Sequence, residues 1–276
     1  MMNNNNRFSY ILPDSLKTEV QGEVLIVSIN RPAKRNAIND ETVLGLERIF
    51  SSVPSEIKCA IIRGEGNHFS SGLDLSELTE RDTFEGIQHS SMWNRAMDAI
   101  GFGKVPVIAI LHGACIGGGL ELASACHIRV AEASAFYALP EGQRGIFVGA
   151  GGSVRLPKII GIARMTDLML TGRVYSAEEG NHFGISQYLV SDGDGLEKAI
   201  GLAKRISENT SITNYAVTQV LPRIADAASD QALMMETLIA AISQNSPEAK
   251  ERIKLFLDGK AKKISDKSDI KKLKDN

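Results

Sequence analysis

The sequence predicts an α/β protein built from repeated β-β-α units, with a helical region at its C-terminal end. Three observations support this fold class. Strand-like apolar runs alternate with amphipathic helical stretches, and turn residues separate them. Residues 105–111 are apolar enough to be buried on both faces, which is typical of a strand inside a parallel sheet. Beyond about residue 154, helical patterns take over.

The strand-bearing part begins with residues 19–30, where Gln21-Gly22 is a turn between a short strand and a longer apolar one. A helix is predicted from a cap near Asn39-Asp40, and residues 59–63 form the next strand. The strand at 105–111 then leads into a glycine triplet and another helix. A third strand pair, at 127–131 and 135–138, runs into Pro140-Glu141.

The C-terminal part reads as a series of helices. Ser176 with Glu179 forms a capping box, and the last helix starts with Ser246 as N-cap and Pro247 at its first position. The other predicted helices cover residues 154–170, 176–183, 195–209, 211–227 and 233–243. No Pro-, Ser- or Gly-rich linker interrupts the chain. We expect an N-terminal extension over 1–18, one core over 19–205, and a helical region with a basic tail over 206–276.

Charge and cysteine content exclude some classes of protein. The formal net charge of −2 gives no global electrostatic reason to expect a nucleic-acid partner. Residues 250–276 carry 10 basic and 5 acidic side chains, which indicates a solvated tail or, alternatively, a basic arm that touches a phosphorylated ligand. Cys59, Cys115 and Cys126 form no CxxC pair and are predicted to be buried free thiols.

The chain carries no apolar run of the roughly 18 residues that cross a bilayer. Its first residues lack the apolar region of a secretory signal. With the three free thiols, these features lead us to expect a cytoplasmic protein without a membrane partner.

Two turns could expose backbone N–H groups to a ligand. Ser71-Gly72-Leu73 follows one strand, and Gly117-Gly118-Gly119 follows another and opens a helix. Ser-Gly turns are common, so either turn alone is weak evidence. Together, the N–H groups of Leu73 and Gly118 could form an oxyanion hole, which stabilises negative charge on a carbonyl oxygen.

Two glutamates follow these backbone features. Glu121 lies in the first turn of the helix after the glycine triplet. A carboxylate there could simply be stabilised by the positive end of the helix dipole, with no role in catalysis. Glu141 could be a loop residue satisfied by Arg144. In a water-poor pocket, however, the pKa values of two such carboxyl groups can be pushed apart, so that one serves as acid and the other as base.

Other site chemistries do not fit the sequence. Residues 149–153 contain three glycines at the wrong spacing for a dinucleotide fingerprint, and we interpret them as a close backbone approach that floors a pocket. The five histidines show no metal-ligand spacing, so no metal site is predicted, and His112 and His127 fit core positions. A Ser-His-Asp hydrolase would need a nucleophile elbow that is not present.

Four co-linear motifs resemble the crotonase, or enoyl-CoA hydratase/isomerase, family, and the resemblance extends over about residues 19–263. The motifs are Asn30 to Ala37, Phe69 to Leu75, Gly117 to Ala123, and Pro140-Glu141 with the glycines at 149–152. The resemblance implies a spiral of β-β-α turns whose C-terminal helices form trimers, usually paired into hexamers. It also implies an acyl-CoA substrate, with no permanently bound cofactor.

The family's roles transfer to particular residues here. The thioester oxygen would lie between the N–H groups of Leu73 and Gly118. Family hydratases keep both glutamates, so the implied reaction is addition of water to a 2-enoyl-CoA, with Glu121 activating the water, Glu141 protonating the α-carbon and Gly149 helping to hold the water. The coenzyme A contacts implied by the resemblance are Lys34, Arg35, Ala37, Ser71, Leu73, Asp74 and Leu75.

The acyl group is less well specified. Residues 138–149 look closest to a bacterial subgroup that includes 3-methylthioacryloyl-CoA hydratases, which favours a short, sulfur-bearing enoyl chain. We expect the acyl pocket to involve Met92, Trp93, Met97 and Phe147, although an aromatic and two methionines at helical spacing also fit plain core. Val148 and His127 depart from the family's usual proline and aspartate.

Two alternatives to hydration stay open at this point. Another reaction on the same scaffold, such as double-bond isomerisation or thioester hydrolysis, would use the same oxyanion hole. A non-catalytic binding protein of this fold, using its basic tail on RNA, would not need both glutamates and both turns.

Overall fold

The computed structural model describes residues 11–77 and 81–260, and the basic tail beyond residue 260 lies outside the described part. The chain divides into two compact units after Ala203. The sequence predicts this division after residue 205. The first unit carries both sheets.

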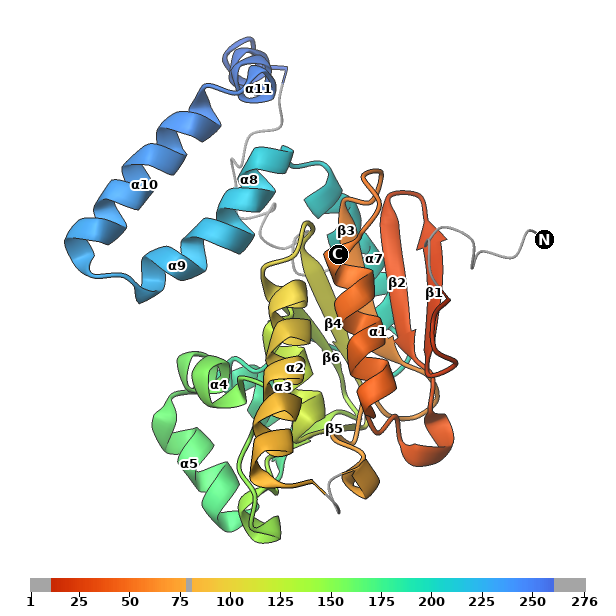
Figure 1. The fold of residues 1–276 in the computed structure, drawn as a ribbon. Coiled ribbons are helices and arrows are strands. Elements are labelled where there is room, and N and C mark those ends of the chain that lie inside the picture. The colour runs from red at the N-terminus through yellow and green to blue at the C-terminus, as the bar shows by residue number, and fades with distance from the viewer. Residues whose placement is uncertain (1–10, 78–80, 261–276) are drawn as a thin grey trace. The chain divides into compact units, whose positions relative to one another are not determined.

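A six-stranded sheet forms the centre of the first unit (Figure 1). Its order is β1 (Leu16–Gln21), β2 (Val24–Ile29), β3 (Cys59–Gly64), β4 (Val107–Leu111), β6 (Ile128–Glu132) and β9 (Tyr188–Val190). β1 and β2 form an antiparallel hairpin and the other pairs are parallel. The turn predicted at Gln21-Gly22 is confirmed, with Gly22 at a φ of 61°. Because residues 16–18 pair with residues 27–29 of β2, they belong to the sheet rather than to an N-terminal extension.

A second sheet of three short strands decides where the glutamates lie. It contains β5 (Ala114–Ile116), β7 (Phe136–Ala138) and β8 (Tyr175–Ser176). The strands predicted at 127–131 and 135–138 are present as β6 and β7, but they lie in different sheets, because the turn in which Ala135 N–H bonds to Glu132 O sends β7 alongside β5. The parallel pairing of β5 with β7 sets Ile116 opposite Ala138, so Gly117 and Glu141, which follow these strand ends, lie on the same side.

Three helices of this unit frame the region where those strands end. α1 (Asp40–Ser51) starts at Asn39, whose side chain accepts the Thr42 N–H as predicted. α2 (Thr83–Gly101) starts with a capping box between Asp82 and Glu85, and it packs beside α1 (Figure 1). α3 (Gly118–Ala125) begins within the glycine triplet and is buried throughout. Short 3₁₀ turns add η2 (Pro32–Lys34), η3 (Leu75–Glu77) and η4 (Gly142–Arg144).

The remaining helices of the first unit are α4 (Gly152–Ile160), α5 (Ile162–Thr171), α6 (Ala177–Phe183) and α7 (Gly195–Ser207), which ends just past the division. The prediction of one helix over 154–170 is wrong, because Gly161 at a φ of 83° breaks it into α4 and α5. The capping box of Ser176 and Glu179 is confirmed. The three cysteines are free and buried, as expected.

The described part of the second unit, up to residue 260, consists of helices. They are α8 (Ser211–Tyr215), the π-helical segment η5 (Ala216–Val220), α9 (Leu221–Asp226), α10 (Ser229–Gln244) and α11 (Pro247–Leu257). The single helix predicted over 211–227 is interrupted by η5. Pro222 lacks the N–H that would bond one turn back, which favours a wider turn before it. Ser246 caps α11 as predicted. Within the described residues, no helix has the length and apolar character needed to span a bilayer.

Candidate active site

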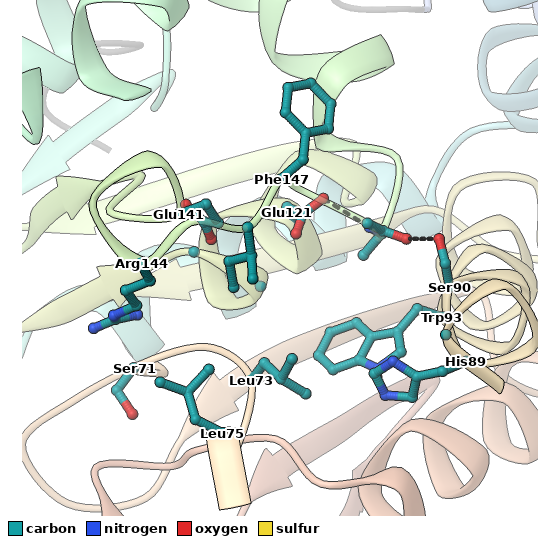
Figure 2. Close-up of a pocket in the computed structure, with 16 residues that line it drawn as sticks. Ser71, Leu73, Leu75, His89, Ser90, Trp93, Glu121, Glu141, Arg144 and Phe147 are labelled. Atoms are coloured by element: carbon teal, nitrogen blue, oxygen red, sulfur yellow. Dashed lines mark hydrogen bonds between the residues drawn. The ribbon is translucent and has the colours of Figure 1, made fainter. Parts of the chain in front are cut away.

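A cavity of about 330 Å³ lies in the first unit where the turns after the strands meet α2 and α3. In Figure 2, Glu121 and Glu141 lie on one side of it and Leu73 and Leu75 on the other. The residues that line the cavity are Ser71, Leu73, Leu75, Gly86, His89, Ser90, Trp93, Gly117, Gly118, Glu121, Glu141, Arg144, Ile146, Phe147, Gly149 and Ala150.

Two backbone N–H groups are available at this cavity. An isolated parallel bridge joins Ile38 to Leu73. It uses Ile38 N–H to Gly72 O at 2.8 Å and Asp74 N–H to Ile38 O at 2.9 Å, so the N–H of Leu73 itself points away from the bridge. Gly118 is the first residue of α3, and the first N–H groups of a helix have no partner within it.

The two N–H groups lie close together because the turn residues have no side chains. A Cβ built on Gly118 would lie 3.3 Å from Leu73 N, and a Cβ on Gly72 would lie 3.0 Å from Gly118 N. Gly72 also has a φ of 89°, which L side chains rarely adopt. The turns thus bring both predicted oxyanion donors to the wall of one cavity.

Glu121 is buried and held by a loop from across the chain. Its Oε1 accepts the N–H of Ala150 at 2.8 Å and that of Gly152 at 2.9 Å. A Cβ on Gly152 would lie 2.6 Å from Glu121 Cγ, so only glycine permits this approach. The carboxylate is therefore bonded to specific donors rather than merely lying in the field of its helix. Burial raises the pKa of Glu121, while these N–H groups and the charge of Arg155 oppose the rise.

Glu141 is also buried, but the donor that acts on its carboxyl group is its own backbone N–H rather than the N–H groups of a distant loop. A Cβ on Gly117 would lie 2.5 Å from its Oε1, and its Oε2 has no hydrogen-bond partner among the described residues. The alternative in which Arg144 satisfies this carboxyl group is not supported at Oε2. Burial raises the pKa of Glu141 to about 7 and the charge of Glu121 adds to the rise, while its own backbone N–H and the charge of Arg144 oppose it.

The two carboxyl groups thus have different environments. Glu121 accepts two N–H bonds, which favour its ionised form, whereas the unpartnered oxygen of Glu141 favours a proton. A base and an acid on one cavity are the roles that such a difference suits.

The expected coenzyme A contacts fall into two groups. Ser71, Leu73 and Leu75 line the cavity, whereas Lys34, Arg35, Ala37 and Asp74 lie outside its wall. Asp74 Oδ2 accepts Arg31 Nη2 at 2.9 Å and Lys34 Nζ at 3.0 Å. The hydroxyl of Ser76, together with these two cations, holds the pKa of Asp74 well below its usual range. Asp74 therefore positions basic side chains, which composition alone did not indicate.

The expected acyl pocket is only partly reproduced. Trp93 and Phe147 line the cavity, but Met92 and Met97 do not, and Met97 is fully buried in the core. The indole of Trp93 lies against the oxyanion turn, since a Cβ on Gly118 would lie 3.1 Å from Trp93 Cη2.

Two lining residues, His89 and Ser90, are not found by sequence reasoning. Trp93 Nε1 donates to His89 Nε2 at 3.0 Å, and the four-residue spacing of the two on a helix is the signal that could have indicated the first. Ser90 donates to the carbonyl of Gly149 at 2.6 Å.

His127 is a satisfied core histidine, as expected. Its Nδ1 accepts the Val107 N–H at 2.9 Å and its Nε2 contacts Gly101 O at 3.1 Å. Burial lowers the pKa of His127 to about 4, so the ring is neutral at physiological pH.

Comparison with known proteins agrees with the motifs. The enoyl-CoA hydratase/isomerase family model matches residues 19–266. The chain belongs to this family. It is 32% identical over 254 residues to the enoyl-CoA hydratase EchA19 of Mycobacterium tuberculosis, covering 90% of this chain and 95% of that one. It is 29% identical to a short-chain-enoyl-CoA hydratase of Clostridium acetobutylicum, and the match covers 87% of this chain and 93% of that one.

A solved structure is closer in sequence. A Rhodopseudomonas palustris protein, provisionally named an enoyl-CoA hydratase, is 56% identical, covers 89% of this chain and 95% of its own, and has a TM-score of 0.87. The present chain therefore has the crotonase fold. Its relatives identify it as an enzyme of the enoyl-CoA hydratase kind.

Proposed function

We propose that this hydratase adds water across the 2,3 double bond of a short-chain 2-enoyl-CoA. The observation that carries the proposal is the pair of buried carboxyl groups, one bonded to two N–H groups and one with an oxygen that has no partner among the described residues, on the same cavity as the backbone of Leu73 and Gly118. Water addition to a conjugated thioester needs a base, an acid and a site for an enolate oxygen.

In the proposed step, the thioester oxygen accepts hydrogen bonds from the N–H groups of Leu73 and Gly118. Ionised Glu121 takes a proton from water, and Gly149 helps to hold that water, while the water oxygen bonds to the β-carbon. The electron pair of the double bond moves toward the thioester and the oxyanion hole stabilises the resulting charge. Glu141 then gives its proton to the α-carbon, and proton exchange with solvent resets both carboxyl groups.

The coenzyme A moiety would extend over Ser71 and Leu75, toward the basic side chains of Lys34 and Arg35. Asp74 would hold Lys34 in place through their 3.0 Å contact. The backbone of Ala37 would also contact coenzyme A along this path. Charge-assisted contacts to phosphate oxygens suit basic side chains that a neighbouring carboxylate has already oriented.

The acyl group would be short. A cavity of about 330 Å³ must hold the reacting carbons and part of the pantetheine, and Trp93 stands directly beside the oxyanion turn. Phe147 also lines the cavity, although its side chain is 68% exposed. A methylthio substituent on the β-carbon fits this proposal, since sulfur makes favourable contacts with an aromatic ring.

The cytoplasmic location of the protein stays a prediction.

The test follows the conjugated enoyl absorbance of crotonyl-CoA and of 3-methylthioacryloyl-CoA. A hydratase removes the absorbance and leaves the thioester intact, an isomerase leaves the mass unchanged, and a hydrolase releases free thiol. We expect Glu121→Gln and Glu141→Gln each to lower turnover by roughly 100-fold or more, since general acid–base groups contribute typically 10²–10⁴-fold. Turnover close to wild type in both variants would sink the two-carboxylate mechanism, and RNA binding without turnover would favour the non-catalytic alternative.

A further inference from the structure

The peptide between Gly149 and Ala150 is held from both sides. Its N–H, on Ala150, donates to Glu121 Oε1 at 2.8 Å, and its C=O, on Gly149, accepts the hydroxyl of Ser90 at 2.6 Å. In a trans peptide the N–H and the C=O point in opposite directions. Figure 2 shows the two bonds running in line from Glu121 through this peptide to Ser90.

The loop is also held at Ala150, by a chain of hydrogen bonds that leads back to the backbone of Glu121. Arg155 donates to the carbonyl of Ala150, and Arg155 Nε contacts Ser124 Oγ at 3.3 Å. Ser124 in turn donates to the backbone oxygen of Glu121 at 2.6 Å. Ser90 differs from these residues because it comes from α2, the helix that also supplies Trp93 to the cavity wall.

A glycine at position 149 gives the loop little conformational preference of its own. The orientation of its carbonyl therefore depends on what bonds to it, and the direction of the Ala150 N–H depends on that carbonyl. We propose that Ser90 is a positioning residue for Glu121 and acts through the peptide between Gly149 and Ala150. The catalytic consequence rests on the proposed function, whereas the positioning itself does not.

The chain of bonds also acts on charge. A hydroxyl that donates to a peptide carbonyl polarises the peptide and strengthens its N–H as a donor. Loss of that bond would weaken the support for ionised Glu121 and raise the pKa of that residue. The charged groups that face Glu121 are Arg155, which favours the ionised form, and Glu141, which disfavours it. Arg144 and His89 line the same cavity.

The test compares Ser90→Ala and Ser90→Thr with Ser91→Ala as a matched control. Ser91 is the next residue on α2, and its hydroxyl donates to Ile87 O of the same helix at 2.8 Å. We expect Ser90→Ala to lower kcat on crotonyl-CoA by about 10- to 100-fold with little change in KM, because a small misplacement of a reacting group can cost that much. Ser90→Thr keeps the hydroxyl and should restore most of kcat, and Ser91→Ala should match wild type.

A second measurement needs no turnover. Carbon-13 NMR of glutamate carboxyl groups in the unliganded protein, assigned with Glu121→Gln, should show a higher pKa for Glu121 in Ser90→Ala and no shift in Ser91→Ala. An unchanged titration, or a kcat equal to wild type in an active enzyme, would overturn the proposal. If wild type hydrates no enoyl-CoA but Ser90→Ala still shifts the titration, the positioning stands and the proposed function fails. Should the alanine variant not fold, Ser90→Cys takes its place, with the same outcomes.

Discussion

Glu121 and Glu141 line the same cavity, and both are buried, yet their carboxyl oxygens have different partners. Burial alone would raise the pKa of both and would give no division of roles. The difference comes from the backbone, which supplies Ala150 and Gly152 N–H groups to one carboxyl, whereas Oε2 of the other has no partner in the described part of the chain. The proposed base and acid are thus distinguished by local hydrogen bonding.

The charge of Arg144 gives a pH test of the acid role. Glu141 has a pKa raised to about 7 by burial, and Arg144 lowers that pKa by favouring the ionised form. If Glu141 must be protonated to act, kcat/KM falls as the pH rises through that pKa. Arg144→Gln removes the positive charge, raises the pKa of Glu141, and should move the alkaline limb of the profile to higher pH.

A control removes one charge away from the cavity. Arg95→Gln deletes a cation on the same helix as Ser90, where it pairs with Glu47 at 3.3 Å. It should leave the pH profile of kcat/KM where it is in wild type. An alkaline limb that does not move in Arg144→Gln, or moves to lower pH, contradicts the assignment of Glu141 as the acid.

Part of the site follows from residue patterns and part does not. Leu73 and Gly118 are predictable because each follows a strand and a turn glycine, and backbone geometry there depends on local sequence. Ser90 is not predictable, because its partner Gly149 is distant in sequence and is reached only after α2 docks. The failure of Met97 as a pocket residue has the same cause: helical spacing identifies a buried face but not which buried side chains meet a cavity.

At the scale of elements, the contact between α3 and the start of α4 depends on one missing side chain. Gly152 is the first residue of α4, and a Cβ there would meet Glu121 Cγ at 2.6 Å and its Oε1 at 2.7 Å. The same backbone N–H donates to that carboxylate. The two helices can therefore hold Glu121 between them only while this position is glycine.

Gly152→Ala should separate helix propensity from site geometry. Alanine favours a helix by about 1 kcal/mol over glycine in a helix interior, yet here it must displace Glu121. We expect turnover of crotonyl-CoA to fall by roughly 100-fold, the cost of a misplacement of about 1 Å. Gly201→Ala in α7 is the control, since its Cβ would meet no atom within 4 Å, and it should keep turnover and gain about 0.5–1 kcal/mol of stability. Normal turnover in Gly152→Ala would contradict this account.

Element boundaries were predictable where caps are local and not where a single residue interrupts a pattern. Asn39, Ser176 and Ser246 each start the helix that the sequence assigns to them. Gly161 ends α4 although the apolar spacing continues past it, and the π-helical segment η5 interrupts the predicted helix over 211–227, so periodicity alone does not show where a regular α-helix stops. The pairing of β7 with β5 depends on contacts between distant strands, which alternation within one strand does not encode.

At the scale of the whole molecule, the second unit exposes a stripe of apolar side chains on α10. Met234, Leu238 and Ile242 follow one another at four-residue spacing and are each more than half exposed, at 67%, 56% and 57%. A contiguous apolar stripe of this kind is typical of an interface. We propose that it contributes to the homotrimer, or pair of trimers, that the family resemblance implies.

Sedimentation analysis of the 29.8 kDa chain should give a trimer or hexamer. Met234→Lys combined with Leu238→Lys should shift the distribution toward monomer, because two charges would be buried at the interface. Glu236→Lys places a lysine about 200° around the same helix from Met234, away from the apolar stripe, and should leave the assembly intact. A wild-type chain that sediments as a monomer, or a double variant that stays assembled, would contradict the proposed interface.

The proposed oxyanion donors belong to the main chain, at Leu73 and Gly118. Alanine scanning would therefore pass over them, because a substituted side chain leaves an N–H in place. Replacing the amide of residue 73 by an ester, through chemical ligation or a hydroxy acid, removes the donor and keeps the side chain. The same property means that the carbonyl-polarising half of the site can persist while residues 121 and 141 diverge, so that new reactions on thioesters can arise around an unchanged backbone.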